Sequence, residues 1–287
     1  MPSKPVVFVV GCARGGSTLL MQWLASTGLV AYPTNLLSRF YKDPYVGALI
    51  HRILYDLDHK GEVFPTKPDR SDFRSELGRT LGANAPHDFG YLWRNYFTFG
   101  ALQSDLVTVP DADRLTGLQS DVASMELVFQ RPVMLKAMEM NWHIPLLRKL
   151  FPDSVFLFVQ RELNAHAASI LKARVDYFGD EAAWYSYKPA EYESIRAAAP
   201  WEQVVSQVWY TNRAVQRGLT GLPDKDVIKV PYDHFCAAPS ELHQKLASRL
   251  GSSSTYEGPM SFKISDRPVD ARRAEESRQL IERLSAA

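Results

Sequence analysis

The sequence predicts an α/β protein of three layers, in which helices cover both faces of a central parallel sheet. Short apolar runs rich in valine alternate with segments of helical periodicity along the chain. Such alternation is typical of parallel strands joined by right-handed helical crossovers. No linker-like stretch divides the 287 residues. We therefore expect one domain, 1–287, with a mixed segment of loops and short helices at roughly 32–130.

The first predicted elements are a strand, a tight loop and a helix. Val6–Val10 is a β-branched apolar run that suits a buried parallel strand. Ser17–Ser26 carries apolar residues at helical spacing, and Gly28 is a suitable C-cap. Within the mixed segment, Tyr45–Leu57 has helical character and Phe89–Phe97 is rich in aromatic residues.

Regular structure is expected again after Pro132. The predicted strands are Val133–Ala137, Val155–Val159 and Val227–Val230. The predicted helices are Ile144–Leu150, Asn164–Val175, Trp201–Arg217, Pro239–Leu250 and Ala274–Leu284. Because the carboxyl ends of parallel strands share one edge, residues that follow these strands should meet there and form the ligand site.

Composition indicates an ordinary globular protein, with 46% hydrophobic and 23% charged residues. The net charge of +1 gives no sign of a nucleic-acid binder, so any positive field should be local. Cys12 and Cys236 are too few for a disulfide scaffold or a cysteine zinc site. We expect a reduced, cytoplasmic setting, with no signal peptide and no membrane span, because no apolar run approaches about 18 residues. The oligomeric state stays open.

The most informative stretch is the glycine loop that follows Val6–Val10. Gly11 and Gly16 have the spacing of the phosphate loop G-x-x-x-x-G-K-[ST], but Ser17 stands at the lysine position and the loop's cation is Arg14. A strand, a glycine loop and a helix start together aim backbone N–H groups at one point. The sequence therefore predicts a site for a phosphate or a similar anion.

Two further cations follow predicted strands. Arg161 comes directly after Val155–Val159, and Ser169 lies about two helical turns later, so both can reach one phosphate. Taken alone, Arg161 is better explained by a helix-capping ion pair with Glu162 or a neighbour. Lys136 ends an otherwise apolar strand and must find an anion or water, or else protect a sheet edge.

The predicted strand ends offer little to hold magnesium. They finish in Lys136, in Arg161 and in Asp233, and only Asp233 is a carboxylate that could approach a metal. The loop also lacks the lysine that contacts β- and γ-phosphates. A metal-dependent nucleotide hydrolase or kinase therefore fits poorly, and a metal-free transfer fits better.

At these residues the chain resembles the sulfotransferases that use 3′-phosphoadenylyl sulfate (PAPS). Their 5′-phosphosulfate loop, roughly [KR]-[ST]-G-[ST]-[ST], is matched by Arg14–Thr18, and their 3′-phosphate motif is matched by Val155–Arg161 with Ser169. Phe151–Asp153 and Val230–Phe235 also look similar. The resemblance covers roughly residues 5–251 and implies a P-loop-like sulfotransferase fold.

The resemblance implies a role for each matching position. Arg14, Gly15, Gly16, Ser17 and Thr18 would hold the 5′-phosphosulfate. Arg161 and Ser169 would hold the 3′-phosphate, Tyr232 would lie near the adenine and Lys136 near the transferring group. Relatives add C-terminal basic residues to the 3′-phosphate site, and the candidates here are Arg267, Lys263, Arg272 and Arg273.

Relatives also need a group that takes the proton of the acceptor. Cytosolic relatives place a histidine two residues after the lysine, where this chain has Met138. Other branches use a glutamate after the first helix, and Tyr32–Arg39 holds no carboxylate. His143 and His87 are the leading candidates, with Glu139 as a third.

The function implied by the resemblance is transfer of a sulfuryl group from PAPS to a hydroxyl or amine of a glycan, lipid or small molecule, without a metal. The segment 32–130 would shape the acceptor pocket. Phe89–Phe97 is most simply core, although its aromatic rings could also form a wall of that pocket. Two alternatives stay open: a divergent phosphate-loop kinase for small molecules, and a nucleotide-binding module that has lost catalysis.

Overall fold

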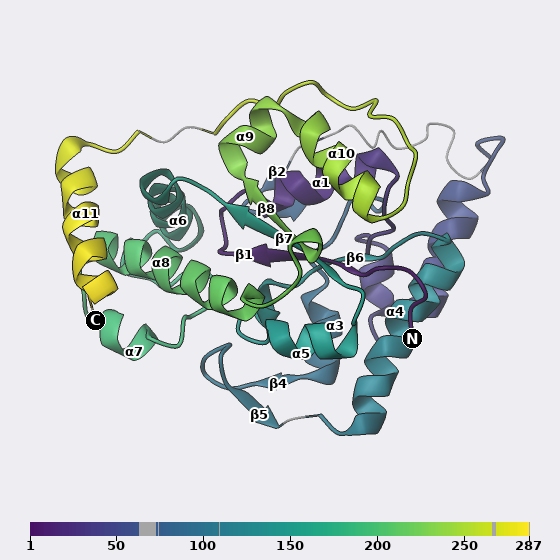
Figure 1. The fold of residues 1–287 in the computed structure, drawn as a ribbon, viewed down its shortest axis with the longest axis horizontal. Helices are drawn as coiled ribbons and strands as arrows, with labels where there is room; N and C mark the ends of the chain where they lie inside the picture. Colours follow the sequence, from purple (N-terminus) through teal and green to yellow (C-terminus); the bar gives the residue numbers. More distant parts are fainter. Residues whose placement is uncertain (63–72, 74, 109, 266–267, 287) are drawn as a thin grey trace.

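Four parallel strands form the central sheet of the computed structural model, in the order β6-β1-β7-β8 (Figure 1). The structure describes residues 1–62, 73, 75–108, 110–265 and 268–286. Phe8 of β1 lies opposite Leu135 of β6 and Phe156 of β7. The strands are β1 (Val7–Gly11), β6 (Met134–Lys136), β7 (Val155–Gln160) and β8 (Val227–Pro231). The predicted parallel sheet is confirmed.

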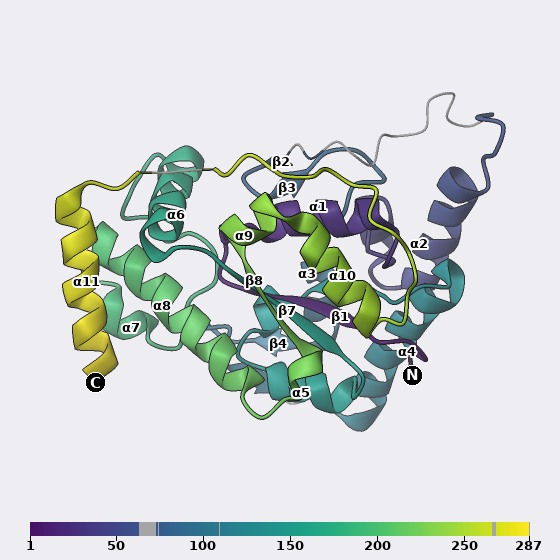
Figure 2. The same cartoon turned by 45° about the horizontal axis from the view of Figure 1, so that its top comes forward.

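Helices cover both faces of this sheet, which makes three layers (Figures 1 and 2). Because strand side chains alternate, β1 feeds two separate cores. Val7 and Val9 pack with α1, α9 and α10, whereas Phe8 and Val10 pack with α3, α4, α5 and α8. The bounds are α1 (Ser17–Thr27), α3 (Gly90–Tyr96), α4 (Ala112–Phe129), α5 (Ile144–Leu150), α8 (Pro200–Leu219), α9 (Tyr232–Ala237) and α10 (Pro239–Arg249).

Aromatic packing anchors the centre of one core. The Phe8 ring lies 5.4 Å from the Phe156 ring, 5.6 Å from the Phe151 ring and 6.2 Å from the Trp93 ring, measured between centroids. Each of these side chains is almost fully buried. Burial of one such ring contributes about 1.5–3 kcal/mol, so this cluster holds α3 firmly against the sheet.

A third apolar cluster joins α6 (Leu163–Phe178), α8 and α11 (Ala271–Ala286) at one end of the molecule (Figure 1). Trp201 of α8 donates its indole N–H to Ser277 of α11 at 3.1 Å. Between α10 and α11, the chain passes over α1, where the hydroxyl of Tyr256 accepts a hydrogen bond from Trp23 at 2.9 Å. The C-terminal helix is therefore packed into the fold.

The segment 32–130 is more regular than predicted. The 18-residue helix α4 was not expected; Asp111 caps it by accepting the N–H of Arg114 at 2.8 Å. Polar and apolar residues are mixed along α4, and only Leu118, Val122, Met125, Glu126 and Val128 are buried, which explains the weak sequence signal. Its other elements are η1 (Leu37–Phe40), α2 (Pro44–His51), η2 (Arg52–Asp56), β2 (Ser75–Glu76), β3 (Arg79–Thr80), β4 (Thr98–Phe99) and β5 (Leu106–Thr108).

The remaining elements match the predicted ones closely. Helix α5 has the predicted bounds, and α1 ends at the predicted cap, Gly28, whose φ is +71°. Short helices lie at η3 (Met138–Met140), α7 (Tyr192–Ile195) and η4 (Asp224–Asp226). Within the described ranges, no helix has the length and apolar character needed to cross a membrane.

Candidate active site

The loop after β1 turns sharply through left-handed backbone conformations. The φ angles of Gly11, Arg14 and Gly16 are +138°, +67° and +103°. A Cβ atom on Gly16 would lie 2.2 Å from the ring of Tyr232, so only glycine fits there. The tight packing brings the loop, the start of α1 and the start of α9 together.

The N-terminus of α1 points into this loop. Gly16 is the N-cap residue and provides no side-chain cap, so the first-turn N–H groups, from Ser17 onward, keep their donors available for a ligand. The helix is 11 residues long and carries no acidic residue in its first turn. Backbone amides and the positive end of the helix dipole therefore favour an anion at this point.

Two buried side chains fix the loop from below. Asn141 accepts the N–H of Gly11 at 3.1 Å and donates to the carbonyl of Gly11 at 2.8 Å, as a neighbouring strand would. His166 of α6 contacts the carbonyl oxygen of Ala13 through Nε2 at 2.7 Å. Since that oxygen can only accept, Nε2 carries the proton. Burial lowers the pKa of His166 to about 4, so this imidazole is neutral near pH 7.

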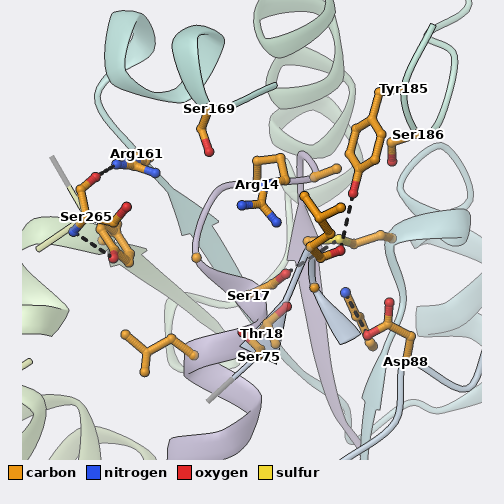
Figure 3. Close-up of a pocket in the computed structure, with 18 of the residues that line it drawn as sticks. Arg14, Ser17, Thr18, Ser75, Asp88, Arg161, Ser169, Tyr185, Ser186 and Ser265 are labelled. Carbon is orange, nitrogen blue, oxygen red and sulfur yellow. Dashed lines mark hydrogen bonds and ion pairs between the residues drawn. The ribbon is translucent and has the colours of Figure 1, made fainter. Parts of the chain in front are cut away.

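A pocket of about 400 Å³ opens above the loop, at the carboxyl ends of the strands. Figure 3 shows its main groups: Arg161, Ser169 and Ser265 gather on one side, and Asp88 and Tyr185 on the other. The loop and the start of α1 lie between them and supply Ala13, Arg14, Gly16, Ser17, Thr18 and Leu19. Of the predicted loop residues, Arg14, Gly16, Ser17 and Thr18 therefore line one pocket, together with Lys136 and Tyr232. Gly15 does not line it; its Cα faces the carbonyl oxygen of Cys12 and the ring of His166.

Arg161 is positioned by the end of β7. Its guanidinium lies 4.9 Å from the ring centroid of Tyr232 and donates to the carbonyl oxygen of Ser265. The N–H of Ser265 in turn donates to the hydroxyl of Tyr232 at 3.4 Å. Ser169 is buried on α6 and lines the same side of the pocket. This side therefore combines a cation, a hydroxyl and a flat aromatic surface.

Lys136 lies on the opposite side, at the end of β6. Its Nζ atom is 2.8 Å from Oδ1 of Asp88, and its own side chain is 10% exposed. The ion pair meets the need of a lysine in an apolar strand for an anionic partner. It also identifies Asp88 as a pocket residue that the sequence interpretation did not single out, because the partner comes from a distant segment.

The histidines proposed as bases lie elsewhere. His143 contacts the backbone oxygen of Gln103 through Nε2 at 2.8 Å, and His87 accepts the N–H of Phe89 through Nδ1 at 2.8 Å. Neither histidine lines the pocket. Burial lowers the pKa of both. Glu139 is buried beside Arg94, whose guanidinium lies 2.7 Å from its carboxylate.

The aromatic run Phe89–Phe97 belongs mainly to the core. Phe89, Trp93 and Phe97 are about 1% exposed, and no residue of the run lines the pocket. Trp93 nevertheless supports the site, because its indole N–H donates to the backbone oxygen of Lys136 at 2.8 Å. The aromatic walls of the pocket come from other residues, namely Phe73, Tyr185, Tyr187 and Tyr232.

Tyr185 and Tyr187 were missed because their segment has no strong periodicity. The hydroxyl of Tyr185 donates to the carbonyl of Leu77 in the β2–β3 turn at 3.4 Å. Burial raises the pKa of Tyr185, and it raises that of Tyr187 more strongly. Both phenols are therefore neutral near pH 7 and able to donate hydrogen bonds.

The C-terminal basic residues are placed as follows. Arg267 lies outside the described residues. Lys263 is exposed and does not line the pocket, while its neighbour Ser265 does. Arg272 and Arg273 belong to α11, where Arg273 stacks 5.1 Å from the ring centroid of Trp201. The structure does not bring these described basic residues to the Arg161 side of the pocket.

A parallel sheet with a glycine loop between strand β1 and helix α1 defines a protein of the phosphate-loop-like α/β class. The model of the sulfotransferase family matches residues 5–256, so the chain belongs to the sulfotransferase family. Members of this family are enzymes that transfer a sulfuryl group, and the resemblance stated from the motifs is confirmed.

Solved sulfotransferase structures share this fold. The enzyme from Alicyclobacillus acidocaldarius has 17% identity and a TM-score of 0.50 over 99% of this chain and 95% of its own. The sulfotransferase domain from the curacin biosynthetic pathway has 13% identity and a TM-score of 0.51 over 99% of both chains. STF1 from Mycobacterium tuberculosis H37Rv has 13% identity and a TM-score of 0.52 over 96% of this chain and 76% of its own. A search of curated proteins by sequence finds no match.

Proposed function

We propose that the enzyme takes its sulfuryl group from PAPS and transfers it to a hydroxyl or an amine of a small-molecule, glycan or lipid acceptor. The observation that carries this proposal is that one pocket holds two separate groups of residues suited to bind anions. The first group is Arg14, Gly16, Ser17 and Thr18 of the loop, and the second is Arg161 with Ser169. A nucleotide with a 5′-phosphosulfate and a separate 3′-phosphate has the charges that such a pair would bind.

The residues of the pocket fit this donor. Arg14 has a buried Nε atom with no hydrogen-bond partner among the described residues, which suits a charged ligand. Its guanidinium and the α1 amides would hold the 5′-phosphosulfate. Arg161 and Ser169 would hold the 3′-phosphate, and Tyr232, whose ring packs on Gly16 and under Arg161, would contact the adenine.

In this reaction the protein mainly positions the two substrates and stabilises the negative charge that develops. A bond from the acceptor oxygen or nitrogen to sulfur forms while the bond from sulfur to the phosphate oxygen breaks, in line. Negative charge collects on that phosphate oxygen, where Arg14, Lys136 and the loop amides stabilise it. Preorganised donors of this kind are worth about 10²- to 10³-fold each in rate.

The kinase alternative has little support in this site. Ser17 occupies the position of the lysine that a phosphate loop uses on β- and γ-phosphates, and the surrounding cations are Arg14, Arg161 and Lys136. The described pocket lining contains a single carboxylate, Asp88, and Lys136 already pairs with it.

Equilibrium binding tests the donor assignment directly. Calorimetry with 3′,5′-adenosine bisphosphate (PAP) and with Mg·ATP should show the tighter binding for PAP. Incubation with ³⁵S-labelled PAPS should release labelled product and PAP.

The Arg14→Ala variant should keep the far-UV circular dichroism of the wild type and lose transfer, because Arg14 lies on a loop. As the matched control, Arg272→Ala removes an exposed arginine of α11 and should behave as wild type. Tight Mg·ATP binding without PAP binding contradicts the proposal.

A further inference from the structure

Asp88 is the one carboxylate in the described lining of the pocket. It lines the pocket on the side opposite Arg161 (Figure 3), and its side chain is 49% exposed. Oδ1 contacts Nζ of Lys136 at 2.8 Å. Oδ2 is the oxygen of the carboxylate that does not make this contact. The ion pair thus holds the carboxylate of Asp88 next to Lys136, the cation that the proposed function places near the sulfuryl group.

The backbone around Asp88 is held in a costly conformation. Phe89, the next residue, has φ of +54° and is buried in the core at 1% exposure. A left-handed conformation is unfavourable for a non-glycine residue and persists only where its surroundings enforce it. Here the buried ring and the start of α3 enforce it, and the turn presents Asp88 to the pocket.

A second contact fixes the distance between Asp88 and the sheet. Trp93, on the first turns of α3, donates to the backbone oxygen of Lys136 at 2.8 Å. A Cβ atom on Gly90 would lie 3.3 Å from the carboxylate of Glu139, so α3 also approaches η3 closely. Asp88 and Lys136 therefore sit on elements that are locked to each other, which is the preorganisation that proton transfer requires.

The other titratable groups near the site are less suited to accept a proton. His87 uses Nδ1 to accept the N–H of Phe89, and His143 is bound to Gln103; neither lines the pocket. Glu139 is buried against Arg94 and does not line it either. Tyr185 and Tyr187 do line it, but their raised pKa values keep them protonated.

We infer that Asp88 is the general base of the transfer. This inference rests on the proposed function. As the acceptor oxygen forms its bond to sulfur and the bond from sulfur to the phosphate oxygen breaks, the hydroxyl proton passes to Oδ2 of Asp88. The electron pair of the broken bond stays on the phosphate, where Lys136 and Arg14 stabilise it. Solvent then takes the proton from Asp88 before the next cycle.

Water can serve as the acceptor in the test, so the natural acceptor need not be known. The rate of PAP release from ³⁵S-PAPS is measured for wild type and for Asp88→Asn, which keeps the size and the Lys136 contact. Calorimetry measures PAP affinity for both. We expect the variant to bind PAP as wild type does and to lose about 10²- to 10⁴-fold in rate. Asp176→Asn is the matched control, since it changes the Lys172–Asp176 pair on α6, outside the pocket lining.

Chemical rescue separates a base from a structural role. Formate added to Asp88→Ala should raise its rate of PAP release toward wild type and leave wild type unchanged, because formate replaces the missing carboxylate. Retained turnover in Asp88→Asn overturns the inference, as does loss of PAP affinity in both variants without formate rescue. Failure of the wild type to bind PAP rejects the proposed function instead, so the two failures are distinguishable.

Discussion

His166 of α6 donates its Nε2–H to the carbonyl oxygen of Ala13 across 2.7 Å, so the helix that follows β7 holds the loop that follows β1. The two halves of the proposed donor site are therefore linked by one partly buried hydrogen bond. Arg161 precedes α6 in the chain, and Arg14 follows Ala13. Burial lowers the pKa of His166 most, and the charges of Arg161 and Arg14 lower it further.

We expect His166 to make folding sensitive to acid. Its pKa is about 4 in the folded protein and about 6.5 when exposed. Between these pH values the unfolded chain binds more protons at this residue, so the free energy of unfolding falls as pH falls from 6.5 to 4, by up to about 3 kcal/mol. His166→Gln keeps a hydrogen-bond donor for Ala13 and removes the titrating imidazole, and with it this part of the pH dependence. Urea unfolding at pH 7 and at pH 4.5 should show a smaller fall for the variant; an equal fall contradicts the prediction.

Gly16 should tolerate no side chain. In Gly16→Ala the new Cβ meets the Tyr232 ring at 2.2 Å and the backbone keeps a φ of +103°. Gly221→Ala is the matched control, because Gly221 has φ of +83° and no atom within 4 Å of its Cβ position. Both variants bear a left-handed penalty of about 1 kcal/mol or more, and only Gly16→Ala adds the clash. Urea unfolding and PAP calorimetry should show the larger losses for Gly16→Ala, and equal losses exclude a steric role for Tyr232.

Arg161→Ala should weaken recognition of the 3′-phosphate alone. A charge-assisted contact is worth about 1.5–3 kcal/mol, so PAP affinity should fall about ten- to a hundredfold. Adenosine 5′-monophosphate lacks the 3′-phosphate, and its affinity should change little. Calorimetry with both nucleotides makes the comparison. Equal losses for the two would place Arg161 elsewhere in the donor site.

Asn141→Ala should destabilise the sheet at its centre. The substitution leaves the buried N–H and carbonyl of Gly11 without partners, and each unsatisfied group costs about 1–3 kcal/mol. We expect the free energy of unfolding in urea to fall by about 2 kcal/mol or more. Thr116→Ala removes an exposed hydrogen bond to Ala112 and should change it far less. Similar small losses in both variants would show that Asn141 does not support the loop.

The predictable parts of this protein are those encoded by consecutive residues. The valine run of β1, the loop Arg14–Thr18 and the pair Arg161 and Ser169 each carry their signal within a short window, and the structure places them at one pocket. Tyr232 came from family resemblance rather than from periodicity, and it lines the pocket as well.

The missed parts depend on contacts between distant segments. Asp88 forms its ion pair with Lys136, which lies on the distant strand β6. The residues next to Asp88 in the sequence carry no pattern that indicates this contact. His166 lies in a helix whose sequence shows nothing unusual. Its role depends on its hydrogen bond to the carbonyl oxygen of Ala13, which is distant in the sequence. His143 is close to Lys136 in the sequence, whereas the turn through η3 directs its side chain toward Gln103.

The central position of β1 has a consequence for affinity. Its five residues are buried, and its backbone is paired with β6 on one side and with β7 on the other. The loop that we propose to bind the donor starts at Gly11, the last residue of this strand. A loop anchored to the least mobile part of a fold has little conformational entropy left to lose when a ligand binds. If Arg14–Thr18 bind the donor as proposed, little of the interaction energy is spent on ordering the loop, because that ordering has already taken place during folding.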